Sequence, residues 1–102
     1  MIDIKATGPI GGDATYPYRA LMDKPYTVRE FVEEIVSHKH NWGAIRYTTS
    51  TADRFGESLC EYKHGKLIGE VDDSIASRQV TEAWGSGGWS RYDFILLIGA
   101  ES

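Results

Sequence analysis

The chain has 102 residues, of which 41% are hydrophobic and 25% are charged, so we expect one globular domain and no second one. Its formal net charge is −4, and neither acidic nor basic residues form a block. Because nucleic-acid affinity depends on clustered Lys and Arg side chains, we do not expect this chain to bind nucleic acid.

Cysteine content and hydropathy are typical of a cytoplasmic protein. Cys60 is the single cysteine, so no internal disulfide can form, which fits a reducing compartment. Residues 1–5 lack the apolar run of a signal peptide. The longest apolar run, Phe94 to Ile98, is far too short to span a bilayer. We therefore expect a cytoplasmic location and no membrane contact.

The first predicted elements are two strands. Ile2 and Ile4 alternate with charged residues, which is the pattern of a half-buried strand. Residues 8–13 are rich in turn formers, and a second strand is predicted over Thr15 to Met22. Because Pro17 has no amide proton, we expect this second strand to lie at an edge of the sheet.

A helix is predicted over about residues 27–39. Thr27 and Glu30 have the spacing of a capping box, and Tyr26 and Phe31 have the spacing of a hydrophobic staple. Apolar residues then recur on one side at helical spacing: Val28, Phe31, Val32, Ile35 and Val36. This pattern predicts an amphipathic helix that packs on a sheet.

The next predicted elements are mostly strands. A strand over Ala44 to Thr49 is followed by a hairpin that pairs Leu59 to Lys63 with Lys66 to Glu70. Residues 64–65, His-Gly, suit its two-residue turn because Gly tolerates a positive φ. Asp72 is a start signal for one short helical turn that would run to residue 78.

The last predicted elements are a hairpin and a buried strand. Val80 to Trp84 and Trp89 to Tyr92 flank Gly85 to Gly88, which we predict as a four-residue loop with a Trp on each side. Phe94 to Ile98 is apolar without alternation, so we predict a central strand that is covered on both faces.

The order of hairpin, helix, strand, hairpin, helical turn and buried last strand resembles the β-grasp, or ubiquitin-like, fold. The resemblance implies a single α+β domain over residues 1–102. It also implies a mixed sheet of four to five strands that is crossed by one helix, about residues 27–39, with the last strand beside the first. The sequence is also similar to small uncharacterised proteins of bacterial accessory genomes, which implies no activity.

This sequence lacks the groups that known activities of β-grasp proteins require. A modifier or sulfur carrier needs a terminal diglycine, whereas this chain ends in Gly99, Ala100, Glu101 and Ser102. A β-grasp ferredoxin needs four cysteines, and only Cys60 exists. The resemblance therefore carries a fold expectation and no activity.

The sequence predicts no metal, no cofactor and no catalytic residue. His38, His40, Cys60 and His64 are possible zinc ligands, but their spacing matches no structural zinc motif. We expect Cys60, in a strand beside Leu59, to be a small buried hydrophobe and not a nucleophile. The Gly-rich segment at residues 85–88 lacks the Lys-Ser/Thr ending of a P-loop.

The predicted binding residues are Trp84, Trp89 and Arg91, because Trp and Arg are enriched at binding hot spots. Two Trp side chains that close one end of the core explain the pattern equally well. We predict a small non-enzymatic interaction module that binds another protein through this Trp/Arg hairpin, an open edge strand, or both. The alternative is a small enzyme or small-ligand-binding protein whose pocket is lined by Tyr16, Tyr18, Tyr47 and the histidines.

Overall fold

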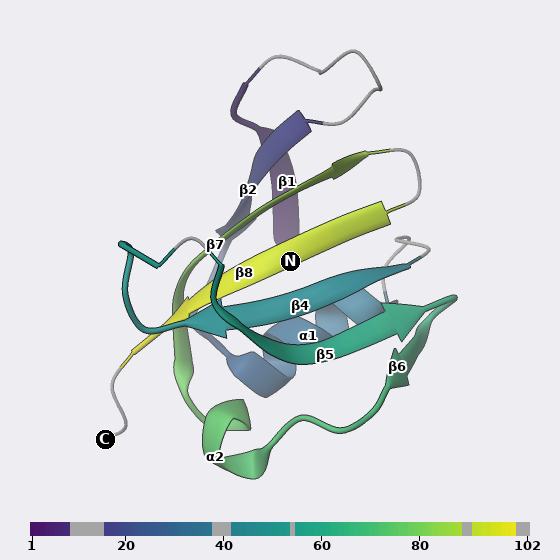
Figure 1. Ribbon diagram of the computed structural model, residues 1–102, viewed down its shortest axis with the longest axis vertical. Coiled ribbons are helices and arrows are strands. Elements are labelled where there is room, and N and C mark those ends of the chain that lie inside the picture. Colours follow the sequence, from purple (N-terminus) through teal and green to yellow (C-terminus); the bar gives the residue numbers. More distant parts are fainter. Residues whose placement is uncertain (9–15, 38–41, 54, 89–90, 100–102) are drawn as a thin grey trace.

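A computed structural model describes residues 1–8, 16–37, 42–53, 55–88 and 91–99 (Figure 1). In chain order its elements are β1 (Ile2–Ala6), β2 (Tyr16–Met22), β3 (Tyr26–Thr27), α1 (Val28–Ser37), β4 (Trp42–Thr48), β5 (Glu57–Lys63), β6 (Lys66–Ile68), α2 (Asp73–Ala76), β7 (Gln79–Gly88) and β8 (Arg91–Ile98).

The strands form one mixed sheet in the order β1-β2-β7-β8-β4-β5-β6, and the short β3 pairs with β7. β8 lies in the middle, antiparallel to β7 and parallel to β4. The prediction of a central last strand is therefore confirmed, but the predicted cover on both faces is wrong, because Ile95 and Leu97 of β8 are only half-buried. Its neighbours, however, are not those of the predicted fold.

The predicted fold class is wrong. Within the described residues the sheet has eight strands and not four to five, and β1 lies at an edge and not beside β8. A second helix, α2, accompanies α1. The physical reason is the length of β7, whose ten residues pair with β2 and β3 on one side and with β8 on the other. β7 thereby separates the first hairpin from the last strand, which excludes the β-grasp arrangement.

The prediction that the second strand lies at a sheet edge is also wrong, because β2 lies between β1 and β7. Pro17 is tolerated for a local reason. Its carbonyl oxygen accepts from the Thr7 amide at 3.0 Å, just past the last β1–β2 pair, Ala6 with Tyr18. Since N–H and C=O of one strand residue point to the same side, the missing donor of Pro17 faces the end of β1. The lack of an amide proton at Pro17 therefore removes few main-chain hydrogen bonds between β1 and β2.

The helix α1 forms as its sequence predicts. The Thr27 amide donates to Glu30 Oε1 at 3.1 Å, and the Glu30 amide donates to Thr27 Oγ1 at 3.2 Å, so both bonds of the capping box are present. The rings of Tyr26 and Phe31 pack edge to face with centroids 6.4 Å apart, which completes the staple. The predicted end of the helix near residue 39 lies outside the described residues.

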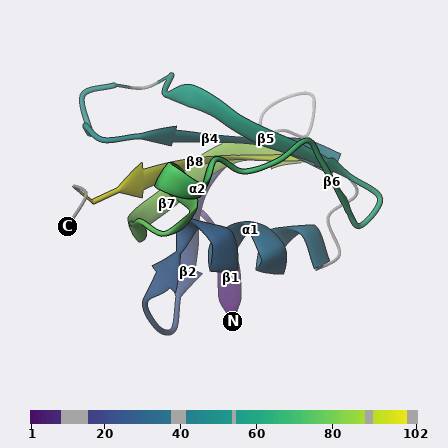
Figure 2. The same cartoon turned by 90° about the horizontal axis from the view of Figure 1, so that it is seen from below.

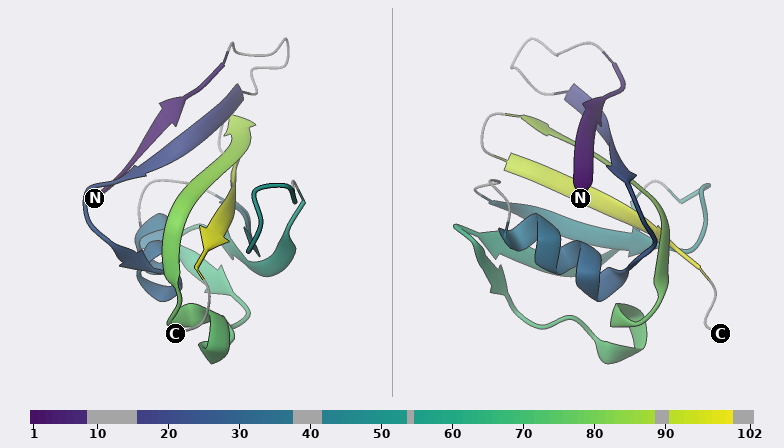
Figure 3. Two further views of the ribbon diagram at one scale, coloured as in Figure 1. Left: turned by 90° about the vertical axis from the view of Figure 1, so that its left-hand side faces the viewer. Right: turned by 180° about the vertical axis from the view of Figure 1, so that it is seen from behind.

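The core lies between α1 and one face of the sheet (Figure 2). Val28, Phe31, Val32 and Ile35 of α1 are buried, and the Phe31 ring meets the Phe94 ring of β8 with centroids 5.9 Å apart. Figures 2 and 3 show α1 on one side of the sheet, and within the described residues no helix covers the opposite face. None of the helices in the described ranges is long and apolar enough to cross a membrane.

Two predicted turns are confirmed. His64 and Gly65 have φ values of 52° and 78°, and they join β5 to β6 as a two-residue turn. Asp72 caps α2, because its Oδ1 accepts from the Ser74 amide at 2.9 Å. The helical turn is shorter than predicted and ends at Ala76.

The predicted four-residue loop at Gly85 to Gly88 is wrong, because all four residues belong to β7. Gly85 pairs with Phe94, and Gly88 pairs with Arg91. The connection between β7 and β8 falls on residues 89–90, outside the described residues. The glycines are needed for close approach: a Cβ at Gly85 would overlap the Asp93 carbonyl oxygen, and one at Gly87 would overlap that of Arg91.

Two buried tyrosines explain why the sheet needs glycine at its centre. The Tyr18 hydroxyl of β2 donates to the Asp93 carbonyl of β8 at 2.6 Å, and the Tyr62 hydroxyl of β5 donates to the Tyr92 carbonyl at 2.7 Å. Each tyrosine therefore reaches over one intervening strand. The residues that they pass are their pairing partners, Gly85 for Tyr18 and Gly43 for Tyr62. A Cβ at Gly43 would lie 2.9 Å from the Tyr62 hydroxyl.

Candidate functional site

The face of the sheet opposite α1 carries the candidate site, and we call it the open face. Strand alternation places one set of side chains on it, since their neighbours along each strand are buried against the helix. The open face is defined by Trp42, Ala44, Arg46, Glu61, Lys63, Trp84, Ser86, Arg91, Asp93 and Ile95. These residues come from β4, β5, β7 and β8.

The most ordered part of the open face is a unit of Trp42, Arg91 and Asp93. The Arg91 guanidinium carbon lies 4.2 Å from the centroid of the Trp42 ring, which is a cation–π contact. Arg91 Nε also donates to Asp93 Oδ2 at 2.8 Å. The second oxygen, Asp93 Oδ1, accepts from the Ala44 amide at 2.8 Å. The guanidinium is therefore held in one orientation by a ring and a carboxylate.

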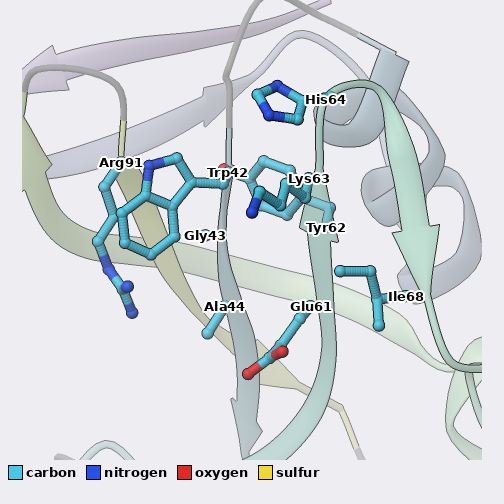
Figure 4. Close-up of a pocket in the computed structure, with 9 residues that line it drawn as sticks. All are labelled: Trp42, Gly43, Ala44, Glu61, Tyr62, Lys63, His64, Ile68 and Arg91. Atoms are coloured by element: carbon cyan, nitrogen blue, oxygen red, sulfur yellow. The ribbon is translucent and has the colours of Figure 1, made fainter.

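Two adjacent hollows lie on the open face, and Ala44 and Arg91 line both. The first, of about 370 Å³, includes Trp42, Lys63 and His64 in its lining (Figure 4). In Figure 4 the Arg91 side chain runs beside the Trp42 ring, and Glu61 and Ile68 lie toward the other side. The second, of about 610 Å³, is lined by residues that include Arg46, Trp84, Ser86 and Ile95.

The structure places two of the three predicted binding residues on the open face. Trp84 is half-buried and pairs with Ile95, while the Arg91 side chain is 44% exposed. Both line the second hollow. Trp89 lies outside the described residues, so its predicted alignment with Arg91 is untested. Trp84 and Arg91 lie on the paired strands β7 and β8 and line the same hollow, although Trp84 pairs with Ile95 and Arg91 with Gly88.

Sequence reasoning missed Trp42, which is 39% exposed and forms the ring under Arg91. A signal was present in the sequence. Trp42 alternates with Ala44 and Arg46, so beginning the predicted strand at residue 42 and not at Ala44 would have placed a large ring and a cation on one face. The sequence does not show which strand pairs with β4. The contact between Trp42 and Arg91 of β8 could therefore not be predicted.

The tyrosines of the alternative function are not gathered in one cavity. Tyr18 is buried in the core, and burial raises its pKa well above the usual range. Tyr47 lies near the other end of β4, where its hydroxyl donates to Glu57 Oε2 at 2.7 Å. Tyr16 packs edge to face on Tyr18. His64 lines the first hollow, whereas His38 and His40 lie outside the described residues.

Cys60 is buried as the sequence predicts, and burial raises the pKa of its thiol to about 11. A thiol with this pKa is almost wholly protonated near neutral pH, so it is a poor nucleophile. Within the described ranges, no three His, Cys, Asp or Glu side chains come close enough to hold a metal ion.

Comparison of the chain with protein-family models, with curated proteins and with solved structures finds no match.

Proposed function

We propose that this chain is a small non-enzymatic interaction module that binds another protein on its open face. The observation that carries the proposal is the convergence of Trp42, Trp84 and Arg91 from three different strands around two adjoining hollows. Trp and Arg dominate the energetics of protein interfaces, because they bury large areas and still form directed polar contacts. A rigid sheet that presents them also loses little conformational entropy on binding.

The open face supports this function better than either edge of the sheet does. β6 has only three residues and carries Lys66, opposite Lys63 of β5. Short edge strands that carry lysine discourage pairing with another chain. β1 at the other edge carries Asp3 and Lys5 among its five residues. Strand addition is therefore the weaker of the two predicted binding modes.

We also propose that the protein is located in the cytoplasm. The support is the buried free thiol of Cys60, which forms no disulfide within the described chain.

Site-specific photo-crosslinking in the native host tests the proposal. A benzophenone amino acid replaces Trp84 in one variant and Glu33 in the control, since Glu33 is exposed on α1, away from the sheet. We expect position 84 to yield a discrete protein adduct that excess unlabelled protein competes away. Position 33 is expected to yield none.

Two checks make this experiment decisive. Far-ultraviolet circular dichroism must show that both variants are folded. A second benzophenone variant at Trp42 is expected to capture the same protein as position 84, because Trp42 lines the first of the two adjacent hollows and Trp84 lines the second. If positions 84 and 33 give identical adduct patterns, the open face is not the contact surface and the proposal fails.

A further inference from the structure

We infer that the partner segment bound on the open face is an extended peptide whose acidic side chain is held between Arg91 and Arg46. This inference rests on the proposed function and adds the chemistry of the ligand. Three observations carry it: the relief of the open face, its local charge, and the orientation of the Arg91 guanidinium.

The relief of the open face follows from the strand register. One row across the sheet holds the shorter side chains Ser86, Asp93, Ala44 and Glu61. On one side of this row lie Arg91, Trp42 and Lys63, and on the other side lie Trp84, Ile95 and Arg46. The two hollows lie along the middle row and share Ala44. The open face is therefore a trough that crosses the strands, with long side chains on both sides of the row at β8 and β4, whereas Gly88 leaves the first side without a side chain at β7.

The walls of the trough are cationic although the whole chain is not. The walls include three cationic residues: Arg46, Lys63 and Arg91. A fourth, Arg19 of β2, pairs with Trp84 and so extends the second wall. The floor holds two carboxylates, and both oxygens of Asp93 already bind within the protein. The chain as a whole has a net charge of −4. An acidic partner would thus be attracted to this face and repelled elsewhere.

The orientation of Arg91 makes it a receptor for a carboxylate. Its Nε is used by Asp93 and the face of its guanidinium by Trp42. As far as the described residues show, the two terminal nitrogens remain for a ligand, and they can bind one carboxylate through two parallel hydrogen bonds. Arg46 lines the same hollow as Arg91 and adds a second cation. Trp84 and Ile95 supply an apolar surface beside them.

A peptide fits this trough better than a single-stranded nucleic acid. A nucleic acid needs open ring faces on which bases stack, but the Trp42 face is covered by Arg91. Its phosphates would also follow the trough past Asp93 and Glu61 on the floor. A peptide can present one carboxylate to Arg91 and Arg46, and an apolar neighbour to Trp84.

Fluorescence anisotropy with defined probes tests the inference. The probes are three fluorescein-labelled peptides of equal length, in which two leucines alternate with two glutamates, two glutamines or two lysines inside a Gly/Ser frame. A short oligothymidylate is the fourth probe. We expect the glutamate peptide to bind at least about tenfold more tightly than the glutamine peptide, because charge-assisted hydrogen bonds add this much or more. The preference should weaken as salt is raised.

Variants of the two arginines locate the effect. R91K keeps the charge but loses the two-nitrogen fork, so it is expected to lower the affinity for the glutamate peptide about tenfold. R46Q is expected to lower it by a smaller factor. R29Q is the matched control, because Arg29 pairs with Asp73 on the helix side, and it should bind like the wild type. Unchanged urea unfolding midpoints confirm that each variant is folded.

The other outcomes overturn the inference in distinguishable ways. Equal or tighter binding of the glutamine or lysine peptide overturns the carboxylate assignment but leaves a protein-binding face. Tighter binding of the oligothymidylate replaces the peptide with a nucleic acid, and the proposed function then fails as well. If no probe binds while position 84 still crosslinks to a protein, the acidic-peptide inference fails and the proposed function stands.

Discussion

Replacing Gly85 with alanine is expected to destabilise the protein by about 2–6 kcal/mol. The added Cβ would overlap the Asp93 carbonyl oxygen and lie 3.2 Å from the Phe94 Cα, and neither backbone atom can rotate away. Local separation of β7 from β8 costs about 1–3 kcal/mol, as overpacking does elsewhere. The Tyr18 hydroxyl, 2.6 Å from the same carbonyl oxygen, would lose its acceptor at a cost of about 1–3 kcal/mol more.

Urea unfolding followed by tryptophan fluorescence measures this loss. The matched control is Gly99→Ala, since the nearest atom to a Cβ at Gly99 is the Gln79 oxygen at 4.0 Å. The control should change the free energy of unfolding by no more than about 0.5 kcal/mol. Because domains of this size are stable by only about 5–15 kcal/mol, Gly85→Ala can leave the protein largely unfolded at 37 °C.

A double-mutant cycle isolates the tyrosine bond within that loss. Tyr18→Phe alone is expected to cost about 1–3 kcal/mol, because it leaves a buried carbonyl group without this donor. In the Gly85→Ala background the same change should cost close to nothing, since the bond is already broken. Equal unfolding midpoints for Gly85→Ala and Gly99→Ala, or additive effects of Gly85→Ala and Tyr18→Phe, would refute the reasoning.

Three further outcomes are expected. Thr27→Ala should lower the free energy of unfolding by about 1 kcal/mol through loss of the cap, and an unmoved urea midpoint would contradict this. Amides of β8 should exchange among the slowest by hydrogen-exchange NMR, whereas faster exchange there than in β1 would argue against a central β8. Burial raises the pKa of the Cys60 thiol from its ordinary value of 9.0 to about 11, so the folded state resists deprotonation of this thiol. Stability should therefore fall as pH rises from about 9 to about 11, and the fall should be smaller in Cys60→Val, which a comparison of urea midpoints checks.

Local elements could be predicted from the sequence because their determinants are local. The capping box of α1 joins residues three apart, and the turn at His64 and Gly65 requires only two residues with positive φ. The central position of β8 was predictable as well, because Phe94 to Ile98 is apolar on both sides of the strand. In each case the pattern and the structure depend on the same few neighbouring side chains.

The elements that sequence reasoning got wrong depend on distant partners. Gly85 to Gly88 has the composition of a turn, yet it is a strand because Tyr18 of β2 and the Asp93 carbonyl of β8 meet across it. Pro17 suggested an edge strand, but the end of β1 is what accommodates it. For the candidate site, Trp84 and Arg91 were predictable by residue type. The contact of Trp42 with Arg91 was not predictable, since it requires the parallel pairing of β4 with β8.

The place of β8 between β7 and β4 has a consequence for the rate of folding. The pairs β1–β2, β4–β5 and β5–β6 join neighbouring segments, and such hairpins form within about 1–10 μs. The pairs β2–β7 and β4–β8 join strands more than 40 residues apart, so a large loop must close before either ladder forms. Because the β1–β2, β7–β8 and β4–β5–β6 parts of the sheet are joined by these long-range pairings, and β3–β7 is a further one, we expect refolding in stopped-flow experiments to take milliseconds to seconds. The order of strands, more than the stability of any one of them, would then set how long the apolar face beneath α1 stays exposed to water.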